Sequence, residues 1–221
     1  MNITFRLFCL LIGYAFGCLQ FAYIIGRIFG RIDIREHGSG NAGTTNAIRV
    51  MGKKAGAAVF FLDILKCTAA FVLCTVIFGG TCSFFDMPAD GIDYLPGLYG
   101  GLGTVLGHNF PVFMKFKGGK GIAASIGLLL ALDFRIAGIA YLAGILAILL
   151  TRYMSALSLA VLGVFAVTVP FFGFVLNVPG FTLEIVLICF LLTALAYFQH
   201  RGNIVRLIKG TEPKFSLRRK R

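Results

Sequence analysis

Three short polar segments interrupt an otherwise apolar chain, and the first has residue types suited to binding an anion. It covers residues 37–46 (HGSGNAGTTN), and Arg49 follows it. Its glycines let backbone N–H groups turn toward an anion, and the helix expected after the loop adds its positive N-terminal end. Thr44 and Thr45 can cap that helix or donate hydroxyl hydrogen bonds. Arg49 can reach the same anion through two N–H groups. The alternative is a glycine-rich connector followed by a capped helix.

The second polar segment is GHNFPVFMKFKGGKG at residues 107–121. Its glycine pair, Gly118 and Gly119, predicts a tight turn that presents Lys120 to a phosphate. It is not a Walker A loop, because position 114 is Met and position 121 is Gly. Its lysines could instead reflect only the positive charge of a cytoplasmic loop. His108 ends an apolar stretch, where a histidine is more often structural than catalytic.

The letters GSGNAG in the first segment also match the dinucleotide-binding pattern GxGxxG. That pattern needs a buried strand before the loop. The preceding residues 33–36 (DIRE) cannot form one. We therefore do not expect nucleotide binding.

The third polar segment is HRGNIVRLIKGTE at residues 200–212. His200, Asn203 and Arg206 recur every three residues, so they share one face of a helix. Side chains of these types suit an oxygen-rich anion, although a solvated helix end at the membrane interface is an equal alternative. Ser155 and Ser158, at the start of another apolar stretch, can turn their hydroxyls toward this cluster.

Composition places these segments in a membrane protein. The chain has 221 residues, of which 58% are hydrophobic and only 14% charged, against roughly 25% charged in soluble domains. Its mean hydropathy is +0.88. Because a bilayer-spanning helix needs about 20 apolar residues, we predict an all-α integral membrane protein with seven transmembrane helices. The predicted spans are 5–26, 55–79, 97–114, 121–133, 136–151, 156–176 and 182–199. A five-span arrangement is the alternative, because only residues 133–135 separate the two short spans.

The distribution of charge predicts the orientation. All but Arg6, Lys66 and Arg135 of the 21 Lys and Arg residues fall in segments expected on one side, namely 27–54, 115–120, 152–155 and 200–221. The loop 80–96 carries acidic residues and no basic ones. The positive-inside rule therefore places the C-terminus in the cytoplasm and the N-terminus outside. The net charge of +12 then indicates contact with anionic lipid rather than with nucleic acid.

We expect residues 1–221 to form a single polytopic membrane domain, with a basic cytoplasmic tail at about 200–221. Acidic residues are scarce in the three segments, and none of the six cysteines forms a CxxC pair. No metal site or cofactor is therefore expected. Asp63 and Lys66, three residues apart inside a predicted span, should pair. The pair has either a structural or a functional role.

Taken together, the three segments resemble the bacterial acyl-phosphate:glycerol-3-phosphate acyltransferase family. The family pattern is GSGNxGATN, then GHxFPVFxxFKGGKG, then HRxNIxRLxxGxE. This chain reads GSGNAGTTN at 38–46, GHNFPVFMKFKGGKG at 107–121 and HRGNIVRLIKGTE at 200–212. It departs at Thr44, where the family usually has Ala. The HxxxxD dyad of acyl-CoA-dependent enzymes is absent, because Ala42, Phe113 and Val205 stand five residues after the three histidines.

The resemblance implies a multi-pass protein of the bacterial inner membrane with its active site facing the cytoplasm. The implied reaction moves a fatty acyl group from acyl-phosphate to the 1-hydroxyl of glycerol 3-phosphate. Arg49, Lys120 and Asn203 would bind the glycerol 3-phosphate, and Arg206 would lie beside them. The acyl-phosphate would be held by Ser39, Asn41, Thr45, Gly118, Gly119 and Ser158, and Ser155 would be a further substrate-binding residue.

The proposed catalytic residues are Lys120, Ser39, His200 and His108, with Lys120 stabilising the oxyanion. The general base is His200, His108 or a phosphate oxygen of the donor. We expect a monomer in contact with membrane lipids. Two other classes remain open: a carrier or channel for a phosphorylated metabolite, and a structural or partner-binding membrane protein.

Overall fold

The computed structural model describes residues 1–78 and 94–215, and this part of the chain is helical and contains no strand. The α-helices are α1 (Ile3–Gly17), α2 (Phe21–Phe29), α3 (Thr44–Met51), α4 (Lys53–Phe78), α5 (Leu95–Asn109), α6 (Ile122–Leu132), α7 (Phe134–Thr151), α8 (Met154–Pro170), α9 (Leu183–Gln199) and α10 (Arg201–Ile208). Short 3₁₀ turns lie at Ile34–Glu36 and Val112–Met114, and Phe171–Val175 continues α8 as a π-helical turn. The predicted all-helical class is confirmed.

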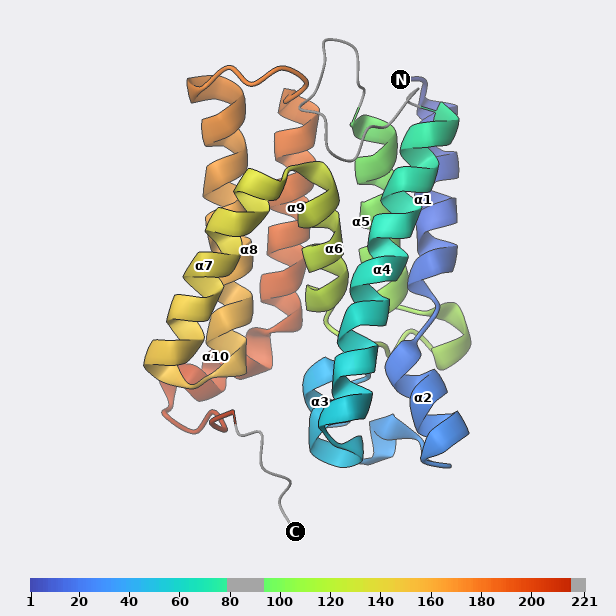
Figure 1. The fold of residues 1–221 in the computed structure, drawn as a ribbon, viewed down its shortest axis with the longest axis vertical. Helices are drawn as coiled ribbons and strands as arrows, with labels where there is room; N and C mark the ends of the chain where they lie inside the picture. The colour runs from blue at the N-terminus through green and yellow to red at the C-terminus, as the bar shows by residue number, and fades with distance from the viewer. Residues whose placement is uncertain (79–93, 216–221) are drawn as a thin grey trace.

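The long helices form two groups that meet at α6. In Figure 1, α1, α4 and α5 lie on one side and α7, α8 and α9 on the other, with α6 between them. Leu128 and Leu129 of α6 are fully buried in the resulting core. The outer faces carry large exposed apolar side chains such as Phe61, Phe134 and Leu150. A soluble protein would bury this much apolar surface, whereas lipid is a suitable solvent for it.

Small residues allow α1 and α5 to approach closely. A Cβ atom on Gly103 would lie 2.2 Å from the carbonyl oxygen of Leu10, and one on Gly107 would lie 2.2 Å from that of Tyr14. The GxxxG spacing in the sequence therefore marks a real helix contact. Helix α5 carries His108 and leads into the glycine turn. The contact with α1 therefore fixes the position of the helix end from which the rest of the second polar segment continues.

The first predicted span, 5–26, lies within a candidate membrane span at Ile3–Phe29, which is interrupted between α1 and α2. The chain breaks after Gly17, and Gln20 lies in the break with its side chain 1% exposed. Its Nε2 donates to the carbonyl oxygens of Gly17 and His108 at 3.1 and 3.0 Å. The buried Gln20 amide thus pairs with one carbonyl group at the end of α1 and with another near the end of α5.

The third predicted span, 97–114, is too long at its C-terminal end. Helix α5 ends at Asn109, and a 3₁₀ turn occupies Val112–Met114. Pro111 explains the boundary, because proline has no N–H and restricts the residue before it to extended backbone.

By length and composition, the described residues contain four helices able to cross a membrane, or five if the bent pair α9 and α10 is one span. The bend between α9 and α10 is 60°. Helix α6 has only 11 residues, or about 17 Å of helix, against an apolar layer of about 30 Å. Asp133 keeps α6 and α7 separate by capping α7, where its Oδ1 accepts from the N–H groups of Arg135 and Ile136. The acidic part of the predicted loop 80–96 and the end of the basic tail lie outside the described residues.

Candidate active site

The first polar segment is a loop folded around one buried side chain, Asn46. Its Oδ1 accepts from the N–H of Ser39 at 2.8 Å, and its Nδ2 donates to the carbonyl oxygens of His37 and Ile34 at 2.9 and 3.1 Å. Gly38 and Gly40 have φ angles of +63° and +72°, which glycine adopts without strain. This ordering leaves Ser39 exposed at the loop surface. Sequence reasoning did not assign Asn46, whose only signal was an amide on the buried face of α3.

A hydrogen bond from Arg35, which precedes this loop, connects it to the second segment. Arg35 binds Asp33 with a 2.7 Å contact and donates through Nη1 to the carbonyl oxygen of Met114 at 3.3 Å. The hydrogen bonds from Arg35 hold the pKa of Asp33 at about 2, below its ordinary value. The carboxylate therefore stays charged throughout the neutral range, and the connection between the two segments persists.

The second segment turns back onto the end of α5. The N–H groups of Gly118 and Gly119 donate to the carbonyl oxygens of Asn109 and His108 at 3.2 and 3.0 Å. A Cβ atom on Gly119 would lie 2.1 Å from His108 Nε2 and 2.8 Å from the carbonyl oxygen of Ala42. Gly119 therefore sits where the first and second segments touch, and only a residue without a side chain fits there.

Replacing Gly119 with alanine is expected to lower kcat/KM by about 100-fold, because the new methyl group must displace either the His108 ring or the first loop. Gly202→Ala is the matched control, because its Cβ would meet only Arg206, at 3.5 Å. Steady-state kinetics of the two purified variants checks the difference. Near-wild-type kinetics for Gly119→Ala would show that the close approach is not required.

The third segment forms a network around Glu212, whose two carboxylate oxygens accept three side-chain hydrogen bonds. Ser155 Oγ and Asn203 Nδ2 donate to Oε1 at 2.7 and 2.6 Å, and Arg206 Nε donates to Oε2 at 2.7 Å. Lys120 Nζ, from the second segment, donates to Asn203 Oδ1. We call these five residues the Glu212 cluster. It joins the start of α8, the glycine turn, α10 and the chain after α10.

The charges of the Glu212 cluster suit an anionic substrate. Burial lowers the pKa of Lys120; the charge of Glu212 opposes this shift and that of Arg206 adds to it. Burial acts to raise the pKa of Glu212, but the hydrogen bonds from Asn203, Ser155 and Arg206 outweigh it and the pKa falls. At neutral pH the cluster therefore carries two cations and one carboxylate. The excess positive charge favours binding of a phosphate.

The structure brings together only some of the predicted site residues. Lys120, Asn203, Arg206 and Ser155 join the Glu212 cluster, whereas Ser158 Oγ donates to the carbonyl oxygen of Met154 on its own helix at 3.0 Å. Within residues 1–78 and 94–215, no hydrogen bond connects the first segment directly to that cluster. The first segment, which contains Ser39, Asn41 and Thr45 and precedes Arg49, instead approaches the glycine turn, where the Ala42 carbonyl oxygen lies against Gly119.

The two candidate histidines are both buried, each with 3% exposure. His200 lies between α9 and α10, with Nδ1 2.8 Å from the carbonyl oxygen of Ala196. That contact assigns the proton to Nδ1 and leaves Nε2 as an acceptor. His108 instead contacts Lys66, and the predicted pair of Lys66 with Asp63 is confirmed at 2.8 Å.

Sequence reasoning placed Glu212 only at the end of the third segment, with no role. The sole signal was a carboxylate ending an otherwise cationic stretch. In the structure it is the acceptor that organises the site.

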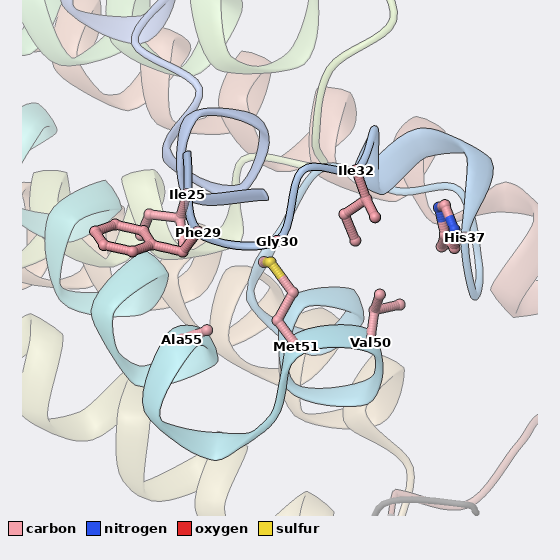
Figure 2. Close-up of a pocket in the computed structure, with 8 residues that line it drawn as sticks. All are labelled: Ile25, Phe29, Gly30, Ile32, His37, Val50, Met51 and Ala55. Carbon is pink, nitrogen blue, oxygen red and sulfur yellow. The ribbon is translucent and has the colours of Figure 1, made fainter. Parts of the chain in front are cut away.

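A pocket of about 430 Å³ lies beside the first segment. Figure 2 shows it between α2, the chain leading to His37, α3 and the start of α4. Its lining is apolar apart from the ring of His37: Ile25, Phe29, Gly30, Ile32, His37, Val50, Met51 and Ala55. It shares no lining residue with the Glu212 cluster, so the two are separate features. Among the described residues, no group of three or more His, Cys, Asp or Glu side chains could hold a metal ion.

Comparison with known proteins shows the family to which the chain belongs. A family model described as glycerol-3-phosphate acyltransferase matches residues 7–210. The chain is 40% identical to the glycerol-3-phosphate acyltransferase of Thermoanaerobacter pseudethanolicus over 92% of both chains. It is also 40% identical to glycerol-3-phosphate acyltransferase 3 of Bacillus anthracis, over 100% of this chain and 99% of that one.

The fold is similar to crystal structures of PlsY (YgiH), an integral membrane glycerol 3-phosphate acyltransferase. The glycerol 3-phosphate form gives a TM-score of 0.79 at 34% identity, covering 96% of both chains. The lysophosphatidic acid form gives 0.77 at 33% identity, with the same coverage. The chain is thus a multi-pass membrane protein, and it belongs to the glycerol-3-phosphate acyltransferase family.

Proposed function

We propose that this protein transfers a fatty acyl group from acyl-phosphate to the 1-hydroxyl of glycerol 3-phosphate. The products are 1-acyl-glycerol 3-phosphate (lysophosphatidic acid) and phosphate, an early step of phospholipid synthesis. The observation that carries the proposal is the Glu212 cluster, which lies beside a glycine turn. In it the two positive charges of Lys120 and Arg206 outnumber the single negative charge of Glu212. The related PlsY structures with glycerol 3-phosphate and with lysophosphatidic acid support the acceptor and the product.

Two phosphate groups must be held side by side in this reaction. We assign the glycerol 3-phosphate to Arg49, Lys120, Asn203 and Arg206, whose donors suit phosphate oxygens. We assign the acyl-phosphate to the glycine turn and to the surface of the first loop, that is to Ser39, Asn41, Thr45, Gly118, Gly119, Ser155 and Ser158. The contact of Ala42 with Gly119 supports this arrangement, because it places the loop against the turn.

The donor is already an activated mixed anhydride, so catalysis needs positioning and charge stabilisation rather than a covalent enzyme intermediate. The 1-hydroxyl oxygen forms a bond to the acyl carbon, and the resulting oxyanion is stabilised by the Lys120 ammonium. The bond from that carbon to the phosphate oxygen then breaks. The hydroxyl proton passes to a phosphate oxygen of the donor, which leaves as hydrogen phosphate. His200, with Nε2 free to accept, is the alternative proton acceptor on the protein.

We further propose seven membrane crossings, with the N-terminus outside and the site facing the cytoplasm of a bacterial cell. Figure 1 supports the odd number, since the start of α1 and helix α10 lie at opposite ends of the bundle. The shorter helices α5 and α6 would complete the crossings within the bundle. The excess of Lys and Arg in the segments at the α10 end supports the orientation. The acyl chain would enter between helices from the bilayer, and the protein would act as a monomer.

The deciding test gives the purified protein glycerol 3-phosphate with either palmitoyl-phosphate or palmitoyl-CoA, without added metal. We expect lysophosphatidic acid and phosphate with palmitoyl-phosphate alone, because the HxxxxD dyad of acyl-CoA-dependent enzymes is absent. Product from palmitoyl-CoA alone would retain the acceptor and reject the proposed donor. A folded sample that makes no product from either donor, but moves glycerol 3-phosphate into vesicles, would make the protein a carrier.

A further inference from the structure

Three buried ionisable side chains lie beside the glycine turn. One of them, His108, is a general-base candidate from the sequence, but the steps of acyl transfer proposed above use none of the three. Asp63 and Lys66 project from α4, and His108 ends α5; all three side chains are at most 4% exposed. Lys66 Nζ lies 2.8 Å from Asp63 Oδ1 and 3.0 Å from His108 Nδ1. We call these residues the Lys66 cluster. Burying two charges inside a membrane bundle is costly, which indicates that they serve more than packing.

The hydrogen bonds of Lys66 fix the orientation of the histidine ring. An ammonium group has three donors and no acceptor. The three hydrogen-bond acceptors of Lys66 are the carbonyl oxygens of Gly17 and Leu19, at 3.2 and 2.7 Å, and His108 Nδ1. The contact with Asp63 Oδ1 is not aligned as a hydrogen bond, so Asp63 supplies compensating charge. With Lys66 as the donor at 3.0 Å, His108 Nδ1 accepts and the ring proton is assigned to Nε2. Asp63 Oδ1 lies farther from the same Nδ1, at 3.5 Å.

The other edge of the same ring supports the glycine turn. A Cβ on Gly119 would lie 2.1 Å from His108 Nε2, so the ring is in contact with the Gly119 backbone. The backbone of His108 contributes as well, because its carbonyl oxygen accepts from the N–H of Gly119 at 3.0 Å. Gln20 Nε2 donates to that carbonyl oxygen too. Ring and carbonyl thus hold one residue of the turn at two points.

We infer that Asp63, Lys66 and His108 are positioning residues that hold the turn of Gly118, Gly119 and Lys120 in its substrate-binding geometry. Lys66 links the His108 ring to the break between α1 and α2. The ring in turn fixes the position of the Gly119 backbone relative to the Ala42 carbonyl oxygen. This inference rests on the proposed function, since that function makes the turn a binding element. Because the turn is assigned to substrate binding, loss of its geometry should raise KM and change kcat little.

His108→Asn is the most informative variant. Asparagine retains an acceptor near the place of Nδ1, so Lys66 keeps a partner, but it removes the ring edge beneath Gly119. We expect the KM for acyl-phosphate, the substrate assigned to Gly118 and Gly119, to rise tenfold or more, with kcat changed less than threefold. Hydrogen–deuterium exchange at the amides of residues 118–121 should accelerate at least tenfold without any substrate present.

A second variant, Asp63→Leu combined with Lys66→Met, removes both charges together and so leaves no uncompensated charge in the bundle. It should raise the same KM and the same exchange rates while His108 is retained. The matched control is Arg6→Met combined with Glu184→Gln. This pair is a bidentate interhelical ion pair at the other end of the bundle, with 2.7 Å contacts. The control should lower the thermal unfolding midpoint and leave KM and exchange at 118–121 unchanged.

The outcomes separate the two proposals. A KM increase of similar size in the control would overturn the inference, because general loss of bundle stability would then explain the effect. Unchanged exchange and unchanged KM in His108→Asn would also overturn it. If the wild-type protein makes no product, the proposed function fails. In that case faster exchange at residues 118–121 in His108→Asn would still show that the ring holds the turn in place. Unchanged exchange would reject that role for the ring.

Discussion

Replacing Lys120 with methionine is expected to lower kcat/KM for acyl transfer by about 10³-fold, or roughly 4 kcal/mol of transition-state stabilisation. Methionine keeps the apolar length of the side chain and removes the ammonium that donates to Asn203 and that we propose stabilises the oxyanion. Lys117→Met is the matched control, because Lys117 is exposed in the same loop. It should change kcat/KM by less than about threefold. Equal and mild losses in both variants would remove Lys120 from the site.

The pH dependence of the wild type tests the same ammonium. Burial lowers the pKa of Lys120 from its ordinary value of 10.5. The active form is protonated, so kcat/KM should fall as the pH rises through this lowered pKa. Lys120→Arg keeps its charge at every accessible pH and should shift the alkaline fall upward while retaining part of the activity. An alkaline limb that does not move would assign the titration to another group.

Replacing Glu212 with alanine is expected to reduce both stability and activity. Three donors, from Ser155, Asn203 and Arg206, would lose their common acceptor. Since each unsatisfied donor costs about 1–3 kcal/mol when buried, and Arg206 is partly exposed, we expect a total loss of about 3 kcal/mol. This corresponds to roughly 10 °C in the unfolding midpoint. Activity should fall about 100-fold even at temperatures well below the unfolding midpoint of the variant, because Asn203 no longer orients Lys120.

Two further variants sharpen this result. Glu212→Gln keeps the shape and one acceptor oxygen, and should show an intermediate loss. Glu36→Gln removes an exposed carboxylate elsewhere on the chain and should leave both quantities nearly unchanged. Differential scanning fluorimetry and steady-state kinetics on all three proteins check the prediction. Wild-type stability in Glu212→Ala would show that the carboxylate does not organise the site.

The sequence by itself determined the properties that depend on neighbouring residues. Runs of apolar residues indicated the helices, and the glycines at 38, 40, 118 and 119 indicated the turns, because each of these features arises within a few residues of chain. The three-residue spacing of His200, Asn203 and Arg206 predicted one shared helix face. Asn203 and Arg206 do converge, on Glu212, whereas His200 precedes α10 and contacts the carbonyl oxygen of Ala196. Three polar segments matching one family pattern were enough to indicate the family.

Only the tertiary structure decided which of these residues meet. The hydrogen bond of Ser155 with Glu212 spans 57 residues of sequence, and that of Lys120 with Asn203 spans 83. The contact of Lys66 with His108 spans 42. None of these pairings has a local signal, because each depends on how separate helices pack. The same applies to the break at Gln20, whose Nε2 donates to carbonyl oxygens of Gly107 and His108 that α5 brings alongside it, as well as to that of Gly17. Packing therefore gathered Ser155, Asn203 and Arg206 around Glu212 and set the His108 ring against Gly119, the contact from which we infer its positioning role.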